Sequence, residues 1–126
     1  MKFLAIGYFD RAAMDALTPA ELDAAMAQCG PHMQALYATG QVRLDVGLAT
    51  QGHDVRTLGG KLSITDGPFA EAKEVVGSAL LIEADSLEDA TRVAALHPAA
   101  ALALGEQLGW RLEVRPVHYF KGDGPG

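Results

Sequence analysis

A single cysteine, Cys29, and the lack of long apolar runs limit what this sequence can be. One thiol cannot close an intramolecular disulfide, which fits a protein of a reducing compartment. No stretch approaches the ~20 consecutive apolar residues of a membrane-spanning helix. The apolar start at 2–9 is closed by Asp10 and Arg11 too early for a secretory signal. We therefore expect a cytoplasmic protein that does not enter a membrane.

Basic residues are scarce as well. Ten Lys and Arg residues are set against 16 Asp and Glu residues, for a formal net charge of −6. Nucleic-acid backbones and anionic membrane surfaces attract clustered positive charge, and here the basic residues are scattered. The composition predicts neither a nucleic-acid partner nor a membrane partner.

Motifs for several kinds of chemistry are missing. The chain has neither a glycine-rich phosphate-binding loop nor a Gly-x-Ser-x-Gly elbow, which argues against nucleotide binding and serine hydrolysis. Its four histidines include no pair at i, i+4 spacing and form no Cys–His cluster. Zinc sites are built from such groups, so we expect neither a metal nor another cofactor.

The sequence does contain the pattern of one α+β domain over 1–120, followed by a flexible, glycine-rich tail over 121–126. Apolar residues on both parities predict strands covered on both faces, and clean alternation predicts half-buried strands. Strands are expected at 2–9, 41–48, 55–58, 61–65, 75–82 and 110–118. Gly59 and Gly60 favour a hairpin with a primed turn between the third and fourth strands.

Two helices are predicted from their end signals. Thr18 as N-cap and Glu21 in the reciprocal position form a capping box, and Gly40 marks the end of this first helix. Pro31 cannot donate a backbone hydrogen bond, so a kink or a short break is expected there. A second helix is expected between residues 86 and 98, with Ser86 at its N-cap and a short helical segment after it.

The order β, α, β, β-hairpin, β, α, β predicts a ferredoxin-like sandwich, in which both helices cover one face of a mostly antiparallel sheet. The opposite face has no helix to cover it, although the strands at 2–9 and 75–82 are apolar on both sides. So large an apolar patch is rare on a monomer. We therefore predict a homodimer in which a second copy covers this open sheet face.

The most distinctive stretch is the loop at 65–74, Thr-Asp-Gly-Pro-Phe-Ala-Glu-Ala-Lys-Glu. Its Asp-Gly-Pro sequence can continue neither a strand nor a helix, so the chain turns there and presents charged groups. Phe69 is expected to anchor the loop to the core. The loop is either a solvated connection or the wall of a site.

With Ile64 before it, this string resembles the YCII-related domain family, and specifically its DGPF branch. Further likeness lies in the apolar strand around Gly77, in 85–90, in His97-Pro98 and in 112–117. The resemblance implies a dimeric α/β barrel of two ferredoxin-like protomers, each with a pocket between its sheet and the elements around it.

The wider family adds a suggestion about chemistry. There, a histidine and an aspartate near the pocket are suspected of acid–base catalysis, and one similar protein is a dehydrochlorinase acting on a chlorinated hydroxyquinol. Counting back from Gly40, the family's histidine would fall near Cys29, and His32 lies one turn later.

Three residues are candidates for acid–base chemistry. Asp66 either initiates a turn or lines the pocket as an acid or base. His32 lies at a helix edge and would need a carboxylate partner to act as a base. His97 is at a helix end, where a protonated imidazole also interacts favourably with the helix dipole.

Four further residues are candidates for substrate binding: Tyr8, Glu71, Lys73 and Arg115. Glu71 and Lys73 are either solvated charges or part of a site, and Arg115 either clamps an anionic substrate or pairs across the sheet. Two functions stay open: cofactor-free proton abstraction or elimination on a small organic acid, and noncatalytic ligand binding by a regulatory or accessory domain.

Overall fold

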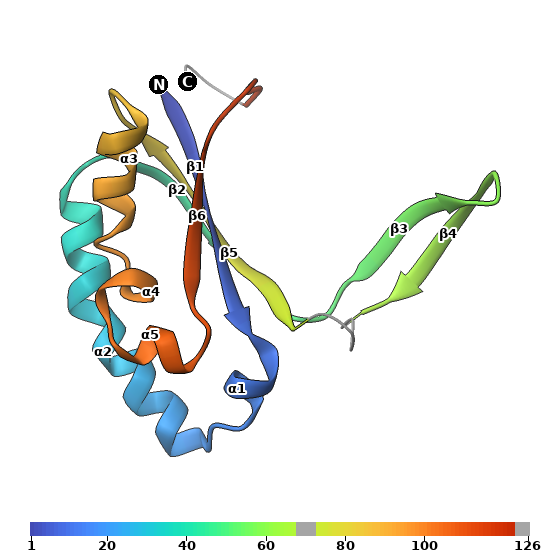
Figure 1. Cartoon of the computed structure of the whole chain (residues 1–126), viewed down its shortest axis with the longest axis horizontal. Helices are drawn as coiled ribbons and strands as arrows, with labels where there is room; N and C mark the ends of the chain where they lie inside the picture. The colour runs from blue at the N-terminus through green and yellow to red at the C-terminus, as the bar shows by residue number, and fades with distance from the viewer. Residues whose placement is uncertain (68–72, 123–126) are drawn as a thin grey trace.

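Residues 1–67 and 73–122 are described by the computed structural model of the chain, shown in Figure 1. Four strands form an antiparallel sheet in the order β2-β5-β1-β6. They are β1 (Lys2–Asp10), β2 (Val42–Gly47), β5 (Glu74–Glu83) and β6 (Arg111–Pro116). In this order each helical connection skips one strand, as in a ferredoxin-like layer. The predicted α+β, ferredoxin-like arrangement is confirmed.

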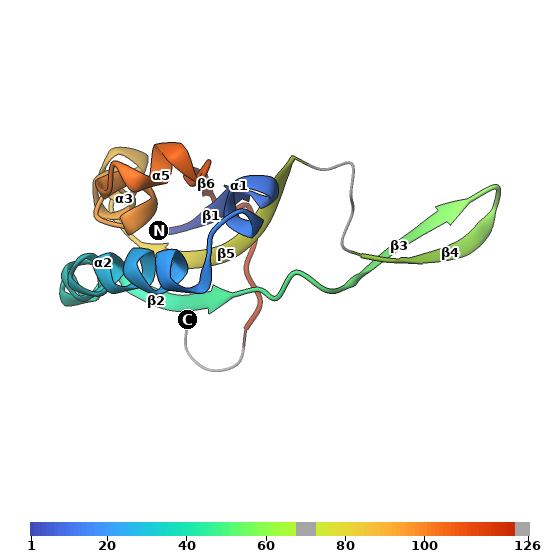
Figure 2. The ribbon, with the colours of Figure 1, turned by 90° about the horizontal axis from the view of Figure 1, so that it is seen from below.

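The core lies between this sheet and two helices on one side of it, α2 (Pro19–Ala38) and α3 (Leu87–Ala94) (Figures 1 and 2). Phe3 of β1 is opposite Ile82 of β5, so the two side chains point to the same side of the sheet. The largest fully buried side chains are Phe3, Leu36, Leu80, Ile82 and Val93. Leu36 comes from α2 and Val93 from α3, which fixes both helices on this core.

The other side of the sheet is also apolar. Alternation along β1 places Leu4 and Ile6 on this side, and Leu44 and Val46 of β2 are paired in register with β5 residues that face the same way. Leu44 and Val46 are exposed. The prediction of a half-buried strand at 41–48 is therefore wrong for the single chain, because the apolar side of this edge strand faces water.

Helix α2 begins and ends as its sequence predicts. The Thr18 hydroxyl accepts from the backbone N–H of Glu21, and the Glu21 carboxylate accepts from that of Thr18. Gly40, past the C-terminus, has a φ of 71°. Of the kink or short break expected at Pro31, the break does not occur, since the helix continues through this residue. Proline removes one hydrogen bond, and the buried side chains on both sides of it, Ala25 and Leu36, hold the two halves on one surface.

Three short helices complete the layer: α1 (Arg11–Asp15), α4 (Pro98–Ala101) and α5 (Leu104–Gln107). The first was not predicted, because five residues are too few to display a helical period. It starts where the Asp10 carboxylate accepts from the backbone N–H of Ala13. Within the described ranges, no helix combines the length and the apolar character needed to cross a membrane.

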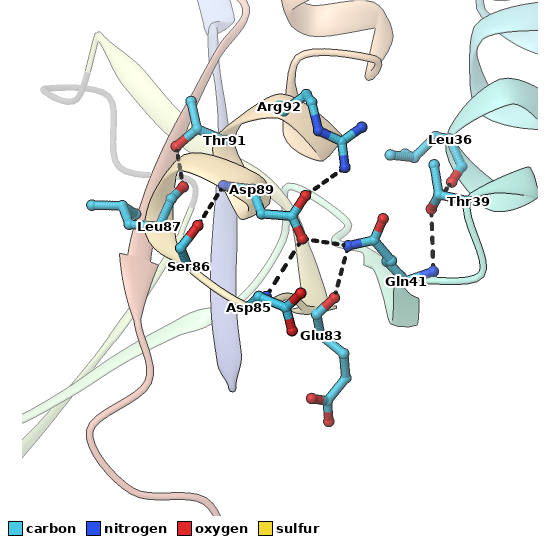
Figure 3. Close-up of polar contacts among 10 residues, drawn as sticks. All are labelled: Leu36, Thr39, Gln41, Glu83, Asp85, Ser86, Leu87, Asp89, Thr91 and Arg92. Atoms are coloured by element: carbon cyan, nitrogen blue, oxygen red, sulfur yellow. Dashed lines mark hydrogen bonds and ion pairs between the residues drawn. The ribbon is translucent and has the colours of Figure 1, made fainter.

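Figure 3 shows a polar network that connects the end of α2 to the start of α3. Gln41 donates from Nε2 to the carbonyl oxygen of Glu83 (3.1 Å) and to Oδ2 of Asp89 (3.0 Å). Asp89 also accepts from the Arg92 guanidinium and the Asp85 backbone, and these donors, Arg92 first, lower the pKa of Asp89. The network braces the end of the sheet at which β1 begins and β5 ends.

The hairpin forms a separate two-stranded sheet, β3 (His53–Leu58) with β4 (Lys61–Asp66). Gly59 and Gly60 have φ of 58° and 78°, as the predicted primed turn requires. Figures 1 and 2 show these two strands projecting away from the four-stranded sheet. We call residues 53–66 the arm and the rest of the fold the body.

Candidate functional site

A cavity of about 450 Å³ lies between the helices and the end of the sheet where β1 ends and β5 begins. It is lined by Gly7, Tyr8, Phe9, Met14, Met26, Cys29, Met33, Leu48, Gly77, Ser78, His97, Pro98, Ala99 and Trp110. The lining is mostly apolar, and none of these fourteen residues is an aspartate, glutamate, lysine or arginine. This is the usual composition of a site for a small organic ligand.

Sulfur is concentrated in the cavity wall. Met26, Cys29 and Met33 follow one another on α2 at spacings of three and four, which puts them on one helix face. Met14 comes from α1, and the Trp110 indole N–H donates to its Sδ at 3.4 Å. Thioethers are polarizable and adapt their shape, and they contact aromatic rings favourably. The wall therefore suits a flat or aromatic molecule.

Small residues on the sheet make room for the cavity. A Cβ at Gly7 would lie 2.2 Å from the Ser78 hydroxyl oxygen, and one at Gly77 would lie 2.9 Å from the Phe9 ring. No larger side chain can stand at either glycine without a shift of these neighbours. Because these two positions carry no side chain, the strands do not fill the cavity at this place.

His97 is the one imidazole in the lining, and its position is set by the start of α4. Its Nδ1 accepts a hydrogen bond from the backbone N–H of Ala99 at 3.0 Å. A neutral imidazole that accepts at Nδ1 carries its proton on Nε2. Burial lowers the pKa of His97 and is the larger influence, while the charge of Asp45 acts in the opposite direction. His97 is thus a neutral hydrogen-bond donor at neutral pH.

Cys29 is the only thiol of the chain, and it is partly buried in the cavity wall. Its Sγ–H donates to the carbonyl oxygen of Ala25 at 3.4 Å. Burial raises the pKa of the Cys29 thiol. The group is therefore a protonated thiol near neutral pH, and it can report on access to the cavity.

We expect Cys29 of the native protein to react with iodoacetamide more slowly than Cys29 of the unfolded chain, and to gain reactivity at pH values above 9.0, the ordinary pKa of a thiol. The reason is that a raised pKa leaves less thiolate at each pH, and only the thiolate attacks. Mass spectrometry of the alkylated chain over a pH series measures the two rates. Equal rates for native and denaturant-unfolded protein at every pH would contradict this burial.

Tyr8 is held in the lining by its neighbours on the sheet. The Arg111 guanidinium lies over the Tyr8 ring, 4.1 Å from its centroid. Arg111 is fixed in turn by two contacts to Glu74, from Nε to Oε2 at 2.6 Å and from Nη2 to Oε1 at 3.1 Å. The bond from Arg111 lowers the pKa of Glu74. Arg111 and Glu74, which are not part of the cavity lining, thus orient the Tyr8 ring in the cavity wall.

The sequence-predicted residues are spread over the molecule. Tyr8 and His97 line the same cavity. His32 is half-buried on α2 but is not in the cavity lining. Lys73 is exposed beside a polar depression of about 520 Å³ lined by Asp10, Lys73, Glu74, Glu106, Gln107 and Gly109. Arg115 is exposed on β6, 4.0 Å from the Glu113 carboxylate. Glu71 and Phe69 lie outside the described residues.

Asp66 ends strand β4 on the arm, and it contacts a histidine that sequence reasoning did not select. His53 Nδ1 lies 3.0 Å from Asp66 Oδ1, and both side chains are exposed. The two residues are register partners at the root of the hairpin. The signal was present in the sequence, because His53 and Asp66 are equally far from the Gly59-Gly60 turn.

The protein is a small α+β domain. Its antiparallel, ferredoxin-like sheet carries α2 and α3 on one face, and between helices and sheet lies an apolar cavity large enough for a small ligand. The sequence profile of the YCII-related domain matches residues 1–110, and the chain belongs to this family. A search of curated proteins found no match to the chain. Within the described residues, no three or more His, Cys, Asp or Glu side chains are placed to hold a metal ion.

Proposed function

We propose that this YCII-related protein is a homodimer whose protomers each bind a small, largely apolar organic molecule in the cavity between sheet and helices. The observation that carries the proposal is the cavity of about 450 Å³ with one neutral imidazole in an apolar wall. Ligand sites commonly have volumes of about 300–1,000 Å³ and a few placed polar groups. The homodimer is supported by the apolar, exposed side of the sheet.

The polar groups of the wall narrow the class of ligand. His97 donates from Nε2, while Ser78 and Tyr8 offer hydroxyl groups that donate or accept. The sulfur-rich side favours an aromatic ring. A flat molecule with a carbonyl, phenol or protonated acid group fits this arrangement best. Noncatalytic binding of such a molecule needs nothing beyond these residues.

Acid–base chemistry is the second candidate, and His97 is the residue that favours it. A neutral imidazole that donates to a carbonyl oxygen stabilises the negative charge that develops when a neighbouring proton is removed. The reaction class would be proton abstraction or elimination on a small acid, without a cofactor. Asp66 lies on the projecting arm and outside the cavity lining of its own protomer (Figure 1), so as the base it would have to come from another chain.

Blocking the cavity tests the binding proposal. We expect Ala99→Phe to weaken binding of the fluorescent aromatic acid 8-anilinonaphthalene-1-sulfonate at least tenfold, a loss of about 1.4 kcal/mol, because the added ring occupies the volume. The matched control is Ala100→Phe, on the same short helix but exposed and outside the lining. Fluorescence titration gives the affinities.

Protection of Cys29 from alkylation shows whether the probe occupies this cavity rather than an outer patch. Protection in the wild type and in Ala100→Phe, and its loss in Ala99→Phe, are the results expected. Unchanged affinity and unchanged protection in Ala99→Phe would refute the cavity as the site. An unbiased metabolite screen by native mass spectrometry then identifies the natural ligand.

A further inference from the structure

The two sides of the arm differ sharply in chemistry. The ladder pairs Val55 with Ile64 and Thr57 with Leu62, so these four residues share one side, with the His53–Asp66 pair at the root of the same side. The opposite side carries mainly polar pairs, Asp54 with Thr65 and Arg56 with Ser63. On the apolar side, Val55, Leu62 and Ile64 are exposed to 62%, 70% and 57%. We call this side the apolar side of the arm.

An exposed hairpin of this kind is not expected to be stable by itself. Two-stranded hairpins are marginal in water unless a further strand or a packed face supports them. Figures 1 and 2 show the arm standing free of the body. An alternation that gathers most of the apolar residues on one side is the pattern of a strand pair made to cover another surface. Something outside the single chain is needed to cover it.

The area available identifies a second copy as that cover. Each of the strands β2, β3, β4 and β6 is six residues long. For strands of this length, with ~3.3 Å per residue and ~4.8 Å between strands, one side of the four-stranded sheet covers about 380 Å² and one side of the arm about 190 Å². Two sheets alone would bury about 760 Å² in total, below the ~1,200 Å² of the smallest specific interfaces. Reciprocal contacts of both arms raise this to about 760 Å² per partner, close to the usual ~800 Å².

We propose that the two copies exchange arms: each arm lays its apolar side on the body of the other copy. The exchange rests on the homodimer of the proposed function, and it adds the contacts of the arms that make the interface large enough. Contact between the two arms alone would hold the bodies apart and leave both open sheet faces in water. Docking on the partner's body covers the arm and permits the sheets to meet.

Substitution on the two sides of the arm tests the exchange. Val55→Thr with Ile64→Thr removes apolar surface from the apolar side and keeps residues that favour strands. The matched control is Leu58→Thr, since Leu58 is also 57% exposed but lies on the other side, opposite Lys61. Sedimentation equilibrium over a concentration series measures the dimer dissociation constant. We expect an increase of at least tenfold for the double variant and less than twofold for the control.

A cross-linking experiment on the otherwise unaltered chain locates the arm. Leu62 is replaced by the photoreactive residue p-benzoylphenylalanine, and ¹⁴N-labelled and ¹⁵N-labelled proteins are mixed and allowed to exchange. Cross-links from the arm of one isotope to the body of the other are expected. Cross-links confined to one chain, or joining arm to arm, would overturn the exchange.

The outcomes separate this inference from the dimer on which it rests. A wild-type protein that sediments as a 13.2 kDa monomer at all concentrations would overturn both the dimer and the arm exchange. A dimer whose dissociation constant is unchanged by Val55→Thr with Ile64→Thr would overturn the exchange and leave the sheet-mediated dimer intact. Ligand binding in the cavity is measured independently and is affected by neither result.

Discussion

Leu36→Ala is expected to lower the free energy of unfolding by about 2–5 kcal/mol, the range for truncating a fully buried leucine. Leu36 is 0% exposed, and it packs in the cluster that contains Phe3, Leu80 and Val93. Of the twenty residues of α2, only Ala25 and Leu36 are buried. Leu36 is therefore the main anchor of the helix, and its loss leaves a cavity that little else can fill.

The consequence reaches the candidate site, because the same helix supplies Met26, Cys29 and Met33 to the cavity wall. Denaturant unfolding with linear extrapolation, at one fixed protein concentration, measures the loss. The matched control is Leu22→Ala on the same helix, where the leucine is 38% exposed and about 1 kcal/mol or less is expected. Equal losses at the two positions would show that Leu36 does not anchor the helix.

Gly105→Ala is expected to destabilise the protein by roughly 1–3 kcal/mol, as overpacking of a filled interior does. A Cβ at Gly105 would lie 2.6 Å from the backbone carbonyl oxygen of Ala99 and 3.5 Å from the Cβ of Trp110. The nearest atom belongs to the backbone, so it cannot turn aside as a flexible side chain would. Helices α4 and α5 have to separate to admit one methyl group.

Ala99 and Trp110 both line the cavity, so this separation should also weaken probe binding. The control is Gly47→Ala on β2, where a Cβ would meet nothing within 4 Å. Gly47 ends β2 and its φ is not positive, so alanine fits its backbone and reduces the conformational entropy of the unfolded chain, which stabilises by roughly 0.4–1 kcal/mol; the control is expected to be neutral or stabilising. Thermal and denaturant unfolding of both variants give the comparison. Gly105→Ala with wild-type stability would mean that α4 and α5 are not tightly packed.

Local signals explain which parts of the fold were predictable. The capping box at Thr18 and Glu21, the glycine pair at the hairpin turn and the N-cap Ser86 act within a few residues, and all three occur in the structure as predicted. Their physics is local, because each satisfies backbone groups or dihedral angles next to itself in the chain. A helix break at Pro31 does not occur for the complementary reason, since packing on both sides of this residue outweighs one missing hydrogen bond.

The candidate site was less accessible from the sequence. Its wall is assembled from Gly7, Cys29, Ser78, His97 and Trp110, which come from five separate segments. Met26, Cys29 and Met33 are spaced at a helical period in the sequence, but this period does not distinguish a packed face from one that borders an empty volume. The state of His97 also depended on tertiary structure, since its pKa is lowered mainly by burial among residues distant in sequence.

By itself, the sequence determined the element order, the helix caps, the hairpin turn and the likeness to the YCII-related family, because these depend on neighbours in the chain. Only the tertiary structure decided that Tyr8 and His97 share a cavity and that the hairpin carrying Asp66 projects from the body as an arm. The physical reason is that a cavity and an arm are defined by how strands and helices stack, and stacking depends on contacts between residues far apart in sequence.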